Sequence, residues 1–222
     1  KKMLQNNPLR TALVIGSTGM VGRELVTQLC ESSEFEQVIS FVRRSSGFSH
    51  SKLQEHVVNF DQPESWKELL KGDVLFSCMG TTLAEAGSKA SQYKVDYTYQ
   101  YETARMAAEN NVPVYVLVSS TGANANSALF YPKIKGQLDE AALKLGFKSV
   151  QILRPGQLYG KRQQKRSAEL FAVKMMFAMN SLGIFKKYRP IHASEVAKAM
   201  ISAAKRTGSN IFTLDELFKL PD

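Results

Sequence analysis

This sequence has few of the residues from which disulfides and metal sites are built. Its two cysteines, Cys30 and Cys78, do not form a CxxC pair, which argues against a disulfide framework or a zinc site. The three histidines, His50, His56 and His192, are scattered along the chain and are not paired at metal-ligand spacing. We therefore predict no metal site, and we expect His192, which precedes a helix start, to be structural.

Long hydrophobic runs are also missing. The longest apolar segment, residues 170–185, is interrupted by Lys174, Asn180 and Ser181, and it is too short and too polar to span a bilayer. The N-terminal stretch KKMLQNNPLR lacks the apolar core of a secretory signal. These absences predict a protein with no membrane partner in the reducing cytoplasm.

The charge is strongly positive but dispersed. The formal net charge is +9, and the only dense basic cluster comprises Lys161, Arg162, Lys165 and Arg166. Positive charge favours anionic partners such as nucleic acid, membrane surfaces and phosphorylated cofactors, but a solvated basic surface is the favoured explanation, so nucleic acid is only a minor hypothesis. The hydrophobic content of 44% is ordinary for a globular chain. We predict a single domain over residues 1–222.

A glycine-rich turn follows the first apolar run. Residues 13–15 are apolar, three glycines recur at three-residue spacing as Gly16, Gly19 and Gly22, and an amphipathic run begins at once. This is the strand, turn and helix pattern of a dinucleotide site: Gly16 allows a tight turn, Gly19 leaves room for a pyrophosphate, and Gly22 lets the helix lie close to the sheet. A glycine-rich turn that binds no ligand is the alternative interpretation.

Two arginines follow the next predicted strand. In dinucleotide folds an acidic residue here binds the ribose hydroxyls of NAD, whereas this chain has Arg43 and Arg44. A guanidinium pairs with a phosphate, so the sequence predicts NADP(H) in preference to NAD(H). The alternative is a solvated basic strand end.

The remaining pattern alternates between strands and helices. We expect further strands over residues 37–42, 57–60, 73–79, 112–118, 149–153 and 210–214, and helices over 20–31, 63–70, 88–110, 132–145, 168–182 and 194–205. This order predicts an α/β fold with a Rossmann-like, doubly wound parallel sheet. Residues from about 156 onward are expected to form a small substrate-side cap. Its helix rich in Met and Phe, residues 168–182, either packs against the sheet edge or a partner subunit, or lines an apolar substrate pocket.

Candidate cofactor residues also follow the third and fourth strands. Asp61 ends the short third strand and could meet the adenine, and Gly80 and Thr81 end the fourth, where a cofactor passes over the sheet edge.

One tyrosine has the setting of a proton donor. Tyr131 is followed four residues later by Lys135, with Pro132 suited to the first helical position, so both side chains share one face of a helix start. A nearby ammonium favours the phenolate and can also bind a cofactor ribose. Upstream, Ser119, Ser120 and Thr121 end a strand, where a hydroxyl could hold a substrate. A plain surface helix is the alternative for the Tyr131 and Lys135 pair.

Four ordered motifs carry a family resemblance. GSTGMVG at 16–22, SSTGA at 119–123, YPKIK at 131–135 and RPGQLYG at 154–160 resemble the extended or atypical branch of the short-chain dehydrogenase/reductase superfamily. More narrowly, FVRR at 41–44, CMGTTLAEAG at 78–87, YKVD at 93–96 and LRPGQLYGKRQ at 153–163 are similar to the Tat-interacting-protein type of oxidoreductase.

The resemblance implies roles for matching residues. Tyr131 would be the proton donor or acceptor, Lys135 would support it and anchor the ribose, and Ser120 would orient the substrate, with Ser119 and Thr121 as close competitors. The cofactor site would comprise Gly16, Ser17, Thr18, Gly19, Met20, Gly22, Arg43, Arg44, Asp61, Gly80, Thr81, Lys135 and Arg166, with Arg162 as a further candidate. No catalytic asparagine can be placed on the preceding helix; Asp96 stands roughly there, which leaves the proton relay open.

These observations predict an NADP(H)-dependent oxidoreductase acting on a carbonyl or alcohol substrate. The alternatives are a redox-sensing regulator that binds NADP(H) without turnover and engages a protein partner, and an epimerase or dehydratase of a sugar nucleotide. The sequence also leaves open whether the partner is a second copy of this chain in a homodimer.

Overall fold

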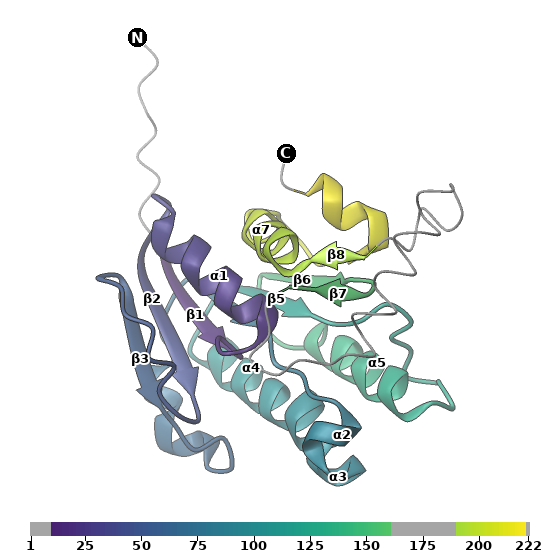
Figure 1. Cartoon of the computed structure of the whole chain (residues 1–222). Helices are drawn as coiled ribbons and strands as arrows, with labels where there is room; N and C mark the ends of the chain where they lie inside the picture. The colour runs from purple at the N-terminus through teal and green to yellow at the C-terminus, as the bar shows by residue number, and fades with distance from the viewer. Residues whose placement is uncertain (1–9, 161–189, 221–222) are drawn as a thin grey trace.

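The computed structural model describes residues 10–160 and 190–220, and its centre is a seven-stranded sheet (Figure 1). The sheet order is β3-β2-β1-β4-β5-β6-β9, and every neighbouring pair is parallel. Its strands are β1 (Arg10–Ile15), β2 (Phe35–Val42), β3 (Leu53–Val57), β4 (Val74–Ser77), β5 (Val114–Val118), β6 (Ser149–Arg154) and β9 (Asn210–Thr213). The predicted Rossmann-like α/β fold is confirmed.

Helices cover both faces of this sheet. The α-helices are α1 (Met20–Glu31), α2 (Leu83–Ala86), α3 (Lys89–Tyr93), α4 (Tyr99–Glu109), α5 (Phe130–Ala142) and α7 (Ala193–Ala203). The structure also has two 3-10 helices, η1 (Pro63–Leu69) and η4 (Leu214–Lys219), and a small parallel pair, β7 (Leu158–Tyr159) with β8 (Ile191–His192).

The core is divided between the two faces by strand alternation. Val14 of β1 and Phe76 of β4 are fully buried with α1 and α7, whereas Leu13 and Leu75 are fully buried on the opposite face with α4 and α5 (Figure 1). Because successive side chains of a strand point to opposite faces, a strand covered on both sides is apolar throughout. This explains the continuous apolar runs in the sequence.

The third strand differs from the prediction. We expected it over residues 57–60, but β3 spans Leu53–Val57 and pairs with β2 at the edge of the sheet. An edge strand is partly exposed to solvent and therefore contains polar residues. It does not form the continuous apolar run that indicates a buried strand. Phe60 lies beyond the strand, where its ring packs 5.3 Å from that of Trp66, and Asp61 follows in a turn and not at a strand end.

The long helix predicted over residues 88–110 is interrupted. Between α3 and α4 lies a π-helical turn, η2 (Lys94–Thr98). The buried Gln100 side chain donates hydrogen bonds to the carbonyl oxygens of Val95 (3.3 Å) and Asp96 (3.0 Å). A π turn shifts the register of the helix, and such turns are frequent at functional sites.

The described part of the predicted cap belongs to the body of the domain. α7 packs on α1, where Gln28 Nε2 donates to the Ser194 carbonyl oxygen at 3.0 Å, and β9 extends the main sheet beside β6. The apolar face of α7 is buried in the core, and β9 is the partly exposed edge strand of the main sheet, so neither element lies above the sheet. The predicted helix 168–182, Arg162 and Arg166 lie outside the described residues. Within residues 10–160 and 190–220, no helix combines the length and the apolar character needed to cross a membrane.

Candidate functional site

The strand order reverses direction between β1 and β4. In open parallel sheets ligands bind at this switch point, outside the carboxyl ends of the strands. The turn at Gly16 follows β1, Gly80 follows β4 and Ser119 follows β5, so these three segments meet at one edge of the sheet.

The glycine turn is too crowded for side chains at two of its positions. Gly16 has φ +79°, and a Cβ added there would lie 2.6 Å from the carbonyl carbon of Cys78. A Cβ on Gly22 would lie 2.1 Å from the Gly16 carbonyl oxygen. The start of α1 is therefore pressed directly against the turn, which brings its N-terminus close to the end of β4.

The N-terminus of α1 suits an anionic group. Its N-cap residue, Gly19, supplies no side-chain hydrogen bond, and the first turn contains no acidic residue. Free backbone N–H groups and the positive end of the helix dipole favour a phosphate there. Thr18 and Gly19 are exposed, Ser17 is buried and Met20 is half-buried, so the turn offers mainly backbone to a ligand. These residues fit the diphosphate of a dinucleotide.

Arg43 and Arg44 lie where β2 ends, and both are exposed. No ion pair of either arginine is found among the residues that the structure describes. Asp61 is already engaged, since it accepts a hydrogen bond from Tyr99 Oη at 2.9 Å and lies 2.7 Å from Lys94 Nζ. These contacts, that of Lys94 first, hold the pKa of the Asp61 carboxyl below its usual range. Its contact with adenine stays a prediction.

Tyr131 and Lys135 have contrasting environments on the first turns of α5. Tyr131 is 39% exposed, whereas Lys135 is 2% exposed. The Lys135 ammonium lies 3.5 Å from Asp96 Oδ1 and donates to the Val118 carbonyl oxygen, also at 3.5 Å. A buried ammonium needs such partners, because desolvation is costly. Lys135 is thus held at the end of β5.

Asp96 connects Lys135 to the segment after β4. It is fully buried in the π turn, and its Oδ2 accepts a hydrogen bond from the Thr81 backbone N–H at 3.1 Å. A Cβ on Gly80 would lie 3.5 Å from Oδ1, so the segment passes directly over the carboxylate. Burial raises the pKa of Asp96, and the Lys135 charge and the Thr81 N–H oppose that rise. Within the described residues Oδ1 makes no hydrogen bond, only the ion-pair contact.

The three hydroxyl residues after β5 are not equivalent. Ser119 is 5% exposed, and within the described residues its Oγ makes no hydrogen bond. Ser120 is half-buried, and its Oγ donates to the Thr121 carbonyl oxygen at 3.2 Å. The Thr121 N–H in turn donates to the Pro155 carbonyl oxygen at 3.0 Å. Ser119 thus points into the core, and Ser120 is more accessible.

Sequence reasoning missed two features that hold this segment. A Cβ on Gly136 would lie 2.2 Å from the Ala125 backbone nitrogen, so the loop after Ser120 lies directly on α5. Asp139 Oδ2 accepts a hydrogen bond from Arg154 Nε at 2.9 Å and forms an ion pair with Nη2 at 2.8 Å, which ties α5 to the end of β6. A glycine inside a predicted helix was the available signal for the first.

His192 precedes α7 and caps it: its Nδ1 lies 2.6 Å from Ser194 Oγ, and Glu195 accepts from its backbone N–H at 3.1 Å. In the two described ranges no group of three His, Cys, Asp or Glu side chains is placed to hold a metal ion.

Comparison with known proteins agrees with this geometry. The model of a family described as NAD(P)H-binding matches residues 16–207. The protein named "Protein FMP52, mitochondrial" from Debaryomyces hansenii is 40% identical over 200 residues, covering 87% of both chains. Its namesake from Candida albicans is 34% identical over 202 residues, covering 88% of both.

Solved structures share the fold at low identity. UDP-glucose 4-epimerase of Thermotoga maritima has a TM-score of 0.68 at 17% identity, over 94% of this chain and 80% of the epimerase. The Bordetella bronchiseptica enzyme WbmG, solved with NAD and UDP, has a TM-score of 0.71 at 10% identity, over 96% of this chain and 74% of WbmG.

The relatives also correct the predicted location. Because they are named as mitochondrial proteins, the expectation of a cytoplasmic protein is wrong. That expectation depended on the missing apolar core of a secretory signal, a test that does not detect amphipathic mitochondrial transit peptides. The extent of the family match and the identity to FMP52 both lead to one conclusion: the chain belongs to the NAD(P)H-binding family and is a relative of the FMP52 proteins.

Proposed function

We propose that this protein is an NADP(H)-dependent oxidoreductase that interconverts a carbonyl and an alcohol, of the short-chain dehydrogenase/reductase type and its Tat-interacting-protein branch. The observation that carries the proposal is the placement of Lys135. Its buried ammonium lies one helical turn after the exposed Tyr131, between Asp96 and the end of β5. A buried, paired lysine beside an accessible tyrosine is the arrangement that proton transfer at a carbonyl oxygen needs.

The bound dinucleotide would supply or accept a hydride at its nicotinamide. Tyr131 gives its phenolic proton to the substrate oxygen in the reductive direction and takes it back in the oxidative one. The Lys135 ammonium stabilises the phenolate electrostatically. Ser120 orients the substrate oxygen, since it is more accessible than Ser119.

The preference for NADP(H) rests on the end of β2. Arg43 and Arg44 are exposed there, in the position where an acidic residue would serve NAD(H). The relatives' names support a mitochondrial location, which fractionation of cells expressing the tagged full-length protein would test.

The decisive experiment is NADPH oxidation against a panel of aldehydes and ketones. Tyr131→Phe is compared with Tyr101→Phe, a matched change at a half-buried tyrosine of α4. We expect Tyr131→Phe to lower kcat by about a hundredfold or more with NADPH binding intact, and the control to retain activity. Tight NADPH binding by the parent without turnover of any carbonyl would instead support a redox-sensing regulator. Conversion of a UDP-sugar without net NADPH oxidation would support an epimerase.

A further inference from the structure

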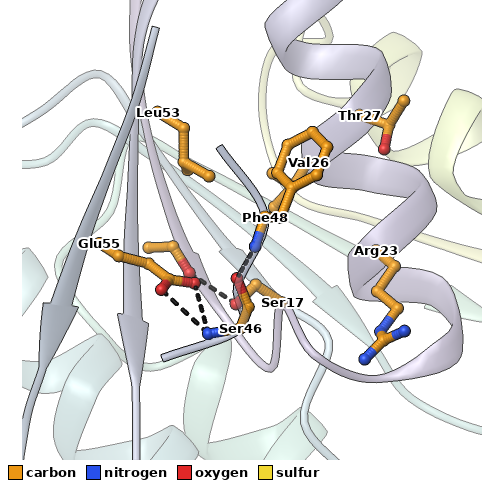
Figure 2. Close-up of a pocket in the computed structure, with 9 residues that line it drawn as sticks. Ser17, Arg23, Val26, Thr27, Ser46, Phe48, Leu53 and Glu55 are labelled. Atoms are coloured by element: carbon orange, nitrogen blue, oxygen red, sulfur yellow. Dashed lines mark hydrogen bonds between the residues drawn. The ribbon is translucent and has the colours of Figure 1, made fainter. Parts of the chain in front are cut away.

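The loop that begins with Arg43 and Arg44 is fastened to the neighbouring strand by Glu55. The Glu55 carboxylate accepts hydrogen bonds from Ser45 Oγ (3.0 Å to Oε2) and from the Ser46 backbone N–H (3.0 Å to Oε2 and 3.3 Å to Oε1). Figure 2 shows the carboxylate pointing from β3 toward Ser46. The residues that directly follow the two arginines are therefore attached to β3.

Sheet register sets the position of Glu55. Glu55 pairs with Ser40 of β2, and the Ser40 hydroxyl donates to Ser17 Oγ in the phosphate turn at 2.5 Å. Ser40 and Ser17 are both buried. Glu55 on β3 and Ser17 in the phosphate turn therefore lie on either side of β2, the strand that ends in the arginines (Figure 2).

The loop after Arg44 has little packing on the side that faces α1 and β3. A cavity of about 160 Å³ lies between the loop, α1 and β3, and its lining includes Ser46 and Phe48 of the loop and Val26 of α1 (Figure 2). Phe48 is 45% exposed, so it does not anchor the loop in the core. Where packing is absent, hydrogen bonds to a charged acceptor become the main attachment.

The two arginines lie between two fixed points. On one side, the Val42 carbonyl oxygen accepts from the Val58 N–H at 2.9 Å, which fixes the end of β2. On the other side, Glu55 fixes Ser45 and Ser46. Such a short span with both ends fixed orders the backbone of Arg43 and Arg44 before a ligand arrives, which lowers the entropic cost of binding.

We propose that Glu55 is a specificity-determining positioning residue, which selects NADP(H) over NAD(H) by holding Arg43 and Arg44 toward the 2′-phosphate of the adenosine ribose. This inference rests on the proposed function. The phosphate turn and Lys135, which would bind the rest of the dinucleotide, do not depend on this loop. Loss of the attachment therefore weakens binding of the cofactor that carries the 2′-phosphate and leaves binding of the other nearly unchanged.

The test is calorimetric binding of NADPH, NADH and 2′,5′-ADP to the full-length protein. Glu55→Ala is compared with Glu36→Ala, which removes an exposed carboxylate from neighbouring β2. We expect Glu55→Ala to weaken NADPH and 2′,5′-ADP binding about tenfold and NADH binding less than about twofold, with no such change in the control. Glu55→Gln, which keeps one acceptor oxygen, is expected to lose less.

A double-mutant cycle separates positioning from a general loss of structure. In a background with Arg43→Ala and Arg44→Ala, Glu55→Ala should no longer affect NADPH binding, because the residues through which it acts are gone. An undiminished effect there, equal losses for NADPH and NADH, or tighter NADPH binding by Glu55→Gln would each overturn the role of Glu55. A parent that does not prefer NADPH would overturn the proposed cofactor preference as well. A parent preference that survives Glu55→Ala overturns only the role of Glu55.

Discussion

The Asp96 carboxylate and the Lys135 ammonium lie 3.5 Å apart, and neither side chain is more than 2% exposed. Asp96 also accepts the Thr81 N–H, so one carboxylate joins the lysine on α5 to the segment that follows β4. A buried charge pair adds little net stability, but the loss of one partner leaves the other charge buried and unpaired. Its value here lies in holding the Lys135 ammonium at the end of β5.

Asp96→Asn should therefore lower turnover more than binding. The amide keeps the size and one acceptor oxygen, but it removes the charge that holds the ammonium. We expect kcat for carbonyl reduction to fall about tenfold or more and the Kd for NADPH to rise by less, because the phosphate turn still binds the diphosphate. The control is Asp73→Asn. In the parent, the Asp73 carboxylate accepts a hydrogen bond from the Thr11 N–H at 2.7 Å, near the starts of β1 and β4. Unchanged kcat in Asp96→Asn would contradict the role assigned to Asp96.

The free energy of unfolding should depend on pH through Asp96. Burial raises the pKa of Asp96, so the folded protein holds this proton more tightly than the unfolded chain does. The contribution of Asp96 is fully present below its ordinary pKa of about 3.9 and is lost as the pH rises through the higher folded value. The free energy of unfolding of the parent, relative to Asp96→Asn, should thus decline as the pH rises above about 4.

Urea unfolding at a series of pH values would measure this difference. Asp61→Asn is the matched control with the opposite sign, because Lys94 and Tyr99 hold the pKa of Asp61 below its usual range. The contribution of Asp61 is present above about pH 4 and is lost as the pH falls further. A parent and an Asp96→Asn variant with the same pH dependence would show that the Asp96 carboxyl has no raised pKa.

Gly22→Ala should damage the phosphate turn. The added Cβ would lie 2.1 Å from the Gly16 carbonyl oxygen, so α1 must move away from the turn. We expect a loss of about 1–3 kcal/mol in the free energy of unfolding, with weaker binding of both NADPH and NADH. Gly146→Ala, where a Cβ meets nothing within 4 Å, is the control. Equal stability of the two variants would show that the close approach of α1 is not required.

Gly136→Ala, a substitution within α5, should lower kcat. Its Cβ would lie 2.2 Å from the Ala125 backbone nitrogen, and it therefore displaces the loop that follows Ser120. We expect kcat to fall about tenfold, because small misplacements of substrate-orienting groups are costly, with NADPH binding retained. Steady-state kinetics would separate these effects, and full activity would show that the loop has no part in orientation.

Local patterns predicted the parts of this site that depend on local geometry. The glycine turn, the apolar strand that ends in Ser119 and the helix that carries Tyr131 and Lys135 each occupy a short stretch of chain. The partners of these groups come from other elements. Asp96 reaches Lys135 because of the π turn, and Glu55 reaches Ser46 because of the pairing of β3 with β2. Neither the π turn nor the edge-strand register leaves a pattern in the sequence that apolar periodicity detects.

The pairing of β7 with β8 joins two segments that are far apart in the sequence. Leu158 lies opposite Ile191, and Tyr159 lies opposite His192, so the two segments meet at one point. That point adjoins the phosphate turn, since a Cβ on Gly160 would lie 3.2 Å from Met20 Sδ. A substitution that separates β7 from β8 would therefore disturb Met20 and the start of α1.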